Sequence, residues 1–247
     1  KTETMAARVV WLVAGGDVRP EEGLGLTFTR KAAAELAERV RRRLRRLRAT
    51  GLWSSGTAER APTEAGHADP AAPDVTVSTY HVYAGRIVGE HGLRLGIEAE
   101  SQLLSEAACW QLASEVVERW TGEMDSVDSA ASTVVRAVLT MSGECAEHLL
   151  EPEDVDRWLA SRVAALEALP YNDKKANGQY AQIRDLVTGL RARRQLMPLV
   201  RAYIDAKRAR DSLDFGDQMA LAARLAETVG PLVASERVRY RAVLLDE

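Results

Sequence analysis

The sequence predicts an α/β protein in which a large, all-helical segment is inserted into a parallel sheet. Apolar runs at 24–28, 75–79 and 242–246 have the length of buried strands, and the first two continue directly into helical patterns. From residue 93 to 210 such strands stop, and apolar residues recur at helical spacing. We therefore expect one discontinuous α/β domain, 1–92 and 211–247, and an inserted helical subdomain, 93–210.

The composition limits what the protein can bind. The 247 residues are enough for one large domain or two smaller ones, and 46% of them are hydrophobic, which is ample for a core. A net charge of −3 excludes a protein that binds polyanions over its whole surface. Any contact with nucleic acid must therefore come from a local patch. No apolar run is long enough to cross a membrane.

The cysteines predict the compartment. Cys109 and Cys145 are not spaced as metal ligands, so we expect reduced core thiols in a cytoplasmic protein. We recognise no signal peptide in the sequence.

The chain begins with Lys1-Thr2 and continues directly into a helical pattern. Two interpretations are open: a frayed terminus, or the end of a phosphate-binding loop, which reads Gly-Lys-Ser/Thr and leads into such a helix. In the second case Lys1 would neutralise the β- and γ-phosphates and the Thr2 hydroxyl would hold Mg²⁺. The glycines of that loop would precede Lys1. Gly15-Gly16 is expected to end the helix.

The strand at 24–28 is followed by a helix from about Lys31 to Arg48. Nine basic and two acidic residues lie between Arg30 and Arg48, and we interpret the distal arginines as a solvated face. At the carboxyl end of the strand, hydroxyls, cations and helix N-terminal amides converge. There we expect phosphate contacts from Thr27, Thr29, Arg30 and Lys31.

The remaining chain is predicted to be mostly helices and loops. Residues 50–74 and 171–178 are polar and predict surface loops. A helix is expected to start at 151–154 with Pro152 in its first turn, and a long one to span Tyr180 to Arg210 with a kink near Pro198. The tryptophans of the helical segment are expected in its core.

Two segments near the sheet resemble motifs of the UvrD/Rep-type superfamily-one DNA helicases. Residues 27–33, Thr-Phe-Thr-Arg-Lys-Ala-Ala, resemble the usual Thr-Phe-Thr-Asn-Lys-Ala-Ala, with Arg30 in place of Asn. Residues 79–81, Thr-Tyr-His, with Arg86 downstream, resemble the family's Thr-Phe-His-Ser segment, although Val82 replaces Ser. In the family, the Thr and His of that segment lie in the single-stranded DNA groove, which implies the same for Thr79 and His81.

Two further segments fit the same order. Asp-Phe-Gly-Asp-Gln at 214–218 resembles the family's Asp-Phe-x-Asp-Leu, but Asp214 as an N-cap and Asp217 in the first helical turn are the more secure roles. The chain ends in an apolar strand followed by Asp246-Glu247, as in a Walker B segment. Asp246 would then hold Mg²⁺ and Glu247 would polarise the attacking water. By itself, this could equally be an ordinary acidic chain end.

The resemblance implies a RecA-like P-loop NTPase sheet that lacks its first strand, with the helical segment as the family's 1B insertion. It implies an ATP-dependent helicase or translocase on single-stranded DNA, with ATP and Mg²⁺ as cofactors. Lys1 and Glu247 would be catalytic, Lys1, Thr2 and Asp246 would bind the nucleotide, and Thr2 and Asp246 the metal. DNA would contact Thr27, Thr29, Arg30, Lys31, Thr79 and His81.

Finer expectations follow from the same resemblance. The arginine- and alanine-rich sequence suggests the actinobacterial AdnB-type helicase–nucleases, which implies double-strand break repair and a partner helicase–nuclease subunit. The isolated chain is expected to hydrolyse little or no ATP.

Three other interpretations stay open. The chain could be a non-catalytic nucleic-acid-binding module that retains a degenerate helicase fold. It could be a plain helical interaction protein, which would have no sheet. It could also be another P-loop kinase or ATPase, although the helical insertion and residues 79–81 speak against that.

Overall fold

The computed structural model describes residues 2–51, 74–125, 127, 129–169 and 180–246. Contacts group the chain into two compact units, residues 1–87 with 225–247, and residues 88–224. The predicted division into 1–92 with 211–247 and 93–210 stays a prediction. Each unit is described by itself.

The first unit contains the predicted sheet. Within the described residues it has three parallel strands in the order β2-β1-β5, formed by Thr76–Thr79, Gly23–Thr27 and Ala242–Leu245. Leu24 of β1 lies opposite Thr76 of β2 and Val243 of β5. The three predicted strands therefore lie side by side, and the interpretation as a purely helical protein is wrong.

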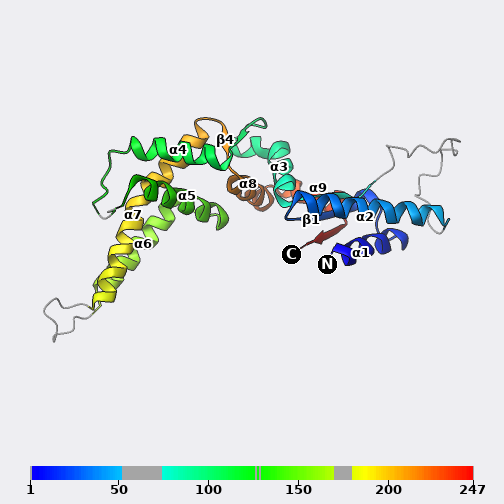
Figure 1. The fold of residues 1–247 in the computed structure, drawn as a ribbon, viewed down its shortest axis with the longest axis horizontal. Coiled ribbons are helices and arrows are strands. Elements are labelled where there is room, and N and C mark those ends of the chain that lie inside the picture. The colour runs from blue at the N-terminus through cyan, green and yellow to red at the C-terminus, as the bar shows by residue number, and fades with distance from the viewer. Residues whose placement is uncertain (1, 52–73, 126, 128, 170–179, 247) are drawn as a thin grey trace. The chain divides into compact units, whose positions relative to one another are not determined.

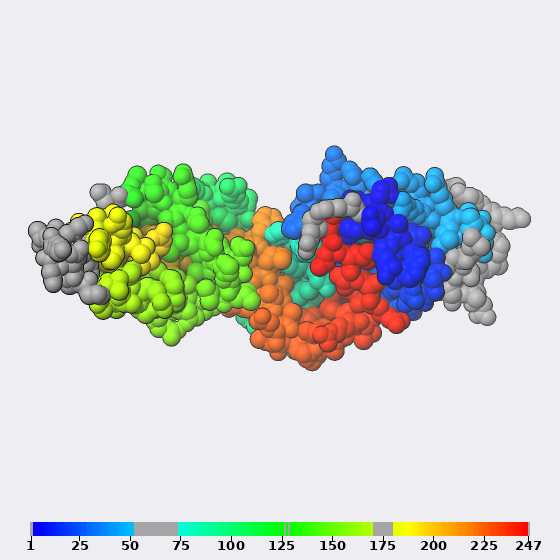
Figure 2. All heavy atoms as spheres, turned by 90° about the horizontal axis from the view of Figure 1, so that it is seen from below, coloured from blue at the N-terminus to red at the C-terminus, as the bar shows by residue number. Residues whose placement is uncertain are grey.

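One face of the sheet is covered by α1 (Thr2–Ala14) and α2 (Arg30–Ala49). The apolar residues of these two helices form one cluster with Val77 of β2, Leu244 of β5 and Val75, which directly precedes β2. Gly25 allows α2 to come close, since a Cβ at this position would meet Leu36 Cδ2 at 3.3 Å. Leu244 of β5 packs against the cluster that includes the buried residues of α1. In Figures 1 and 2, the start of α1 and the end of β5 accordingly lie side by side.

The other face of the sheet carries α3 (Tyr80–His91) and α9 (Gly230–Arg239). Leu24 and Leu26, which alternate with Gly25 along β1, pack here with Tyr240, Tyr80 and Tyr83. A short 3₁₀ turn, Pro20–Glu22, leads into β1. α1 ends as predicted: Gly16 has φ 75°, and the Asp17 amide donates to the Leu12 carbonyl at 3.0 Å.

The second unit is built on helices α4 (Glu106–Glu118), α5 (Ala131–Glu147), α6 (Pro152–Glu167) and α7 (Ala181–Arg208). Their core includes Val138, Leu199 and Tyr203, each completely buried. A 3₁₀ turn, Gly92–Leu95, precedes them, and α8 (Phe215–Thr228) follows.

This unit differs from the sequence expectation in two respects. Gln102–Leu103 (β3) and Ser212–Leu213 (β4) pair as a small parallel sheet that two-residue runs could not reveal. Trp158 was expected in the core, yet it is 56% exposed and lies under the Arg162 guanidinium, 5.5 Å from its ring centroid. Pro152 opens α6 and α7 is one long helix through Pro198, both as predicted, while the kink near Pro198 stays a prediction.

Both cysteines are free. Cys145 is buried and Cys109 half-buried, and burial raises the pKa of each thiol. Among the described residues, none of the helices combines the length and the apolar content needed to cross a membrane. The loops predicted at 50–74 and 171–178 lie largely or wholly outside the described residues.

Candidate functional site

The carboxyl ends of the three parallel strands meet at one edge of the sheet. Thr27 of β1 lies opposite Thr79 of β2, and the Asp246 amide, directly after β5, donates to the Leu26 carbonyl at 2.9 Å. This register places the segments after 27, 79 and 245 next to one another. The edge therefore collects residues from three motif-like segments that are far apart in the sequence.

The turn from β1 into α2 is built by two threonines. Thr27 is completely buried, and its hydroxyl donates to the Thr29 carbonyl at 3.1 Å. Thr29 is the N-cap of α2, and its hydroxyl oxygen accepts from the Ala32 amide at 3.1 Å. Both hydroxyls thus shape the turn, and a contact of either with DNA stays a prediction.

The turn from β2 into α3 repeats this arrangement. The hydroxyl oxygen of Thr79, which is buried, accepts from the Val82 amide at 3.3 Å, three residues along the chain. His81 and Val82 follow on the exposed first turn of α3. α2 and α3 thus both begin at the same sheet edge, and their N-terminal amides make it favourable for anions.

An aromatic pair joins the two turns. Phe28 is 69% exposed although it directly follows a buried strand, and its ring centroid lies 5.0 Å from that of Tyr80. Phe28 was not among the predicted site residues. The signal in the sequence was its position: it follows Leu24 and Leu26 at strand spacing, but one residue beyond the end of β1. An exposed aromatic ring beside cationic groups is a surface on which nucleic-acid bases stack.

Among the described residues, Arg30 and Lys31 bring positive charge to this edge, and both are exposed on the first turn of α2. They differ from the arginines further along the helix, many of which are paired with acids. Glu3 of α1 accepts from Arg39 at 2.9 Å and also binds Arg43, and Asp74 binds Arg41. Arg30 and Lys31 lie where α2 begins, so the first turn of this helix brings positive charge to the sheet edge.

Arg86, the downstream arginine of the second motif, is engaged inside the first unit. Its guanidinium donates to Glu236 of α9 at 2.6 Å, and the Tyr83 hydroxyl donates to the same carboxylate, also at 2.6 Å. Burial alone would raise the pKa of Glu236, but these two hydrogen bonds together hold its pKa below the ordinary 4.5. The network fixes α3, and with it Tyr80 and His81, against α9.

The predicted nucleotide and metal residues lie at the chain ends. Thr2 is the first residue of α1, and half-buried Asp246 follows β5. Lys1 and Glu247, the predicted catalytic residues, lie outside the described residues. Among the described residues, no three His, Cys, Asp or Glu side chains form a metal-binding group. The donor set of one carboxylate and one hydroxyl still suits Mg²⁺, which commonly takes its other ligands from phosphate and water.

Asp214 and Asp217 lie in the second unit and have structural roles there. Asp214 Oδ1 accepts from the Asp217 amide and Asp217 Oδ2 from the Asp214 amide, each at 2.9 Å, which forms a reciprocal cap at the start of α8. Lys207 Nζ bridges both carboxylates at 2.6 Å, and only 3% of this side chain is exposed. Burial raises the pKa of Asp217, against the attraction of Lys207. Lys207 is not among the residues predicted from the sequence, because its partners come from a later segment.

Known proteins share this sequence pattern. The family model described as "UvrD/REP helicase N-terminal domain" matches residues 1–247. DNA helicase IV of Escherichia coli (strain K12) is 29% identical over 224 residues, which cover 87% of this chain and 28% of that protein. The ATP-dependent DNA helicase PcrA of Leuconostoc citreum is 26% identical over 154 residues, 62% of this chain and 17% of that protein. The matched part of the chain thus spans less than a third of the length of each of these relatives.

Proposed function

Since the chain belongs to the UvrD/REP helicase N-terminal domain family, we propose that it is part of an ATP-dependent motor that moves along single-stranded DNA. The observation that carries the proposal is the shared sheet edge. There the register of β1, β2 and β5 brings the Thr27–Lys31, Thr79–His81 and Asp246 segments together. The names of both relatives, a DNA helicase and an ATP-dependent DNA helicase, support it.

The DNA strand would lie across the starts of α2 and α3. Bases would stack on Phe28 and Tyr80, since one ring is 69% exposed and the other supports it at 5.0 Å. Arg30, Lys31 and His81, exposed on the two first turns, would contact the phosphates. The buried threonines would keep these first turns in place.

The nucleotide would bind at the start of α1. Thr2 and Asp246 would hold Mg²⁺, which neutralises the charge that develops on the phosphates during hydrolysis. Lys1 would contact the β- and γ-phosphates, and Glu247 would accept a proton from the attacking water. The names of the two relatives mention neither a nuclease nor a partner subunit, so the proposal includes neither. Action in double-strand break repair stays a prediction of the sequence resemblance.

DNA binding by the 247-residue chain tests the stacking surface. We expect Phe28→Ala to weaken the binding of a fluorescent oligothymidylate, measured by anisotropy at low salt, by about tenfold, since a base–aromatic stack contributes about 1–3 kcal/mol. The unfolding midpoint should hardly change, because the ring is mostly exposed.

Trp11→Ala is the matched control. Trp11 is 57% exposed and lies near the C-terminal end of α1, outside the two turns proposed to bind DNA. Its removal should leave the affinity unchanged. Equal losses in the two variants, or no loss in Phe28→Ala, would contradict the proposed DNA surface.

A further inference from the structure

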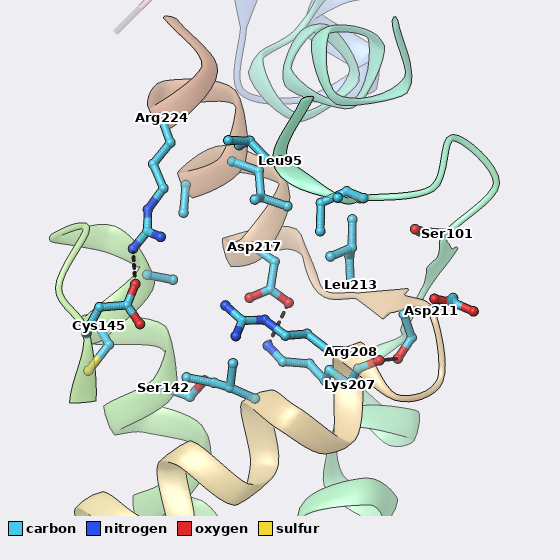
Figure 3. Close-up of a pocket in the computed structure, with 18 of the residues that line it drawn as sticks. Leu95, Ser101, Ser142, Cys145, Lys207, Arg208, Asp211, Leu213, Asp217 and Arg224 are labelled. Carbon is cyan, nitrogen blue, oxygen red and sulfur yellow. Dashed lines mark hydrogen bonds and ion pairs between the residues drawn. The ribbon is translucent and has the colours of Figure 1, made fainter. Parts of the chain in front are cut away.

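The second unit contains a cavity that the proposed motor function does not use. Its volume is about 520 Å³, and all the residues that line it lie between Leu95 and Arg224. The walls come from the segment before β3, the end of α5, the end of α7, β4 and α8 (Figure 3). This volume falls within the range of small-molecule sites, about 300–1,000 Å³.

Much of the cavity wall is apolar. Leu95 and Ile97 come from the segment before β3, Ile204 from α7, Leu213 from β4 and Leu221 from α8. A ligand body without polar groups would therefore find matching surface on several sides.

Two of the three cations at the wall are already occupied. Lys207 binds Asp214 and Asp217, each at 2.6 Å, and Arg224 donates to Glu151 at 2.7 Å. These pairs hold α8 against α7 and against the start of α6, and their charges are compensated within the protein. They form the frame of the cavity and leave little charge for a ligand.

Arg208 is different. Its ion contact is with Asp205 on the same helix at 3.8 Å, and both side chains are 57% exposed. Figure 3 shows its guanidinium directed into the cavity beside the Lys207–Asp217 ion pair. A guanidinium with so loose a partner can bind the acid group of a ligand.

The acids at the wall limit the charge of that ligand. The cavity wall carries four carboxylates but three cations, so its charge opposes the entry of a polyanion. The carboxylates are those of Glu98, Glu151, Asp211 and Asp217. A nucleotide or a free phosphate would meet this repulsion, whereas a single acid group near Arg208 gains one ion pair. The cavity therefore favours one negative charge on an apolar body.

We propose that this cavity binds a monoanionic organic molecule, a carboxylate or sulfonate with an apolar body, through Arg208. The proposal does not depend on ATP or DNA binding, since none of the residues proposed for those functions lines the cavity.

The dye 1-anilinonaphthalene-8-sulfonate, which has an apolar body and one sulfonate, is the first probe. We expect saturable 1:1 binding to the folded 247-residue chain, measured by dye fluorescence, and displacement by octanoate but not by inorganic phosphate or ADP. Dye binding that does not saturate, or displacement by phosphate or ADP, would overturn the proposal.

Variants locate the site. Arg208→Gln should weaken dye binding by about tenfold, the loss expected for one charge-assisted hydrogen bond. Arg193→Gln, the same change on the same helix but outside the cavity wall, should leave dye binding unchanged. Equal effects of the two would mean that the dye responds to surface charge alone, and the proposal would be wrong.

A cavity-filling change provides a second readout. Ala220 of α8 lines the cavity, and Ala220→Phe should abolish dye binding if the variant keeps the thermal unfolding midpoint of the parent within a few degrees. Should this variant not fold, the Arg208→Gln and Arg193→Gln pair decides the question. Full dye affinity in a folded Ala220→Phe variant would refute the cavity as the binding site.

Discussion

The two units of this chain build strand-to-helix junctions in similar ways but expose different groups. In the first unit, Thr29 and Thr79 each accept from an amide three residues ahead, and beside them Phe28 is 69% exposed. In the second unit, Asp214 and Asp217 cap α8, but Lys207 binds both carboxylates and is almost completely buried.

Binding residues and structural residues differ in whether their charges are already paired within the protein. Lys207 is bound to both aspartates, so a ligand would have to displace an existing ion pair. Arg30 and Lys31, by contrast, present their charges on an open helix turn. A charged residue in a motif-like segment is therefore a better candidate for ligand binding when it is exposed than when it is buried in an ion pair.

The largest effect should come from the junction between β4 and α8, which we call the closed junction because Lys207 binds both of its aspartates. Lys207→Met removes the cation shared by Asp214 and Asp217, and we expect a loss of about 3 kcal/mol in the free energy of unfolding, measured with urea. This is the lower end for a broken buried ion pair, because the two carboxylate side chains keep 25% and 19% of their exposure.

The matched control is Lys31→Met at the junction between β1 and α2, which we call the open junction because its cations are exposed. Lys31 is exposed at the start of α2, so its stability change should stay within about 0.5 kcal/mol. Similar losses at both lysines would contradict the distinction between a closed and an open junction.

An intermediate effect is expected at Glu236, which fixes α3 behind the open junctions. Glu236→Gln keeps the shape but loses the charge that Arg86 and Tyr83 bind, and should cost about 1.5 kcal/mol at about pH 7.

This loss should depend on pH. Because the pKa of Glu236 is lowered in the folded state, its contribution is present above the ordinary value of 4.5 and disappears as the pH falls below it. Urea unfolding of parent and variant should therefore converge in acid. A difference that stays constant from neutral to acid pH would show that the charge of Glu236 is not the cause.

The smallest effect concerns the cap itself. Thr29→Val removes the hydroxyl that accepts from the Ala32 amide and should destabilise the first unit by about 1 kcal/mol. Thr50→Val, at the other end of α2, removes a hydroxyl that donates to the Leu47 carbonyl and should cost less than about 0.5 kcal/mol. Urea unfolding midpoints compare the two, and a larger loss at Thr50 would contradict the capping role.

Much of the fold could be predicted because local patterns were strong. The apolar runs marked all three strands of the main sheet, and Gly16 marked the end of α1. The β3–β4 pair was missed because two residues have no measurable period. Trp158 was misplaced because the helical stripe does not reveal which side another helix will cover.

The candidate site was only partly predictable. Thr29, Arg30 and Lys31 stood out because hydroxyls and cations after a strand are informative by themselves. Phe28 did not, since an apolar residue next to a strand is normally buried. Its exposure follows from the end of the strand pairing at Thr27, which depends on the neighbouring strands.

By itself the sequence determined the three strands of the main sheet, several helix limits and the family, because these depend on the order and spacing of residues along the chain. Only the tertiary structure decided which polar groups are open and which are closed. Thr27 is sealed by its neighbours, Lys207 meets aspartates seven and ten residues later, and Phe28 is left uncovered beside Tyr80. The physical reason is that exposure and ion pairing depend on the packing of segments that are distant in the sequence, which no local pattern contains.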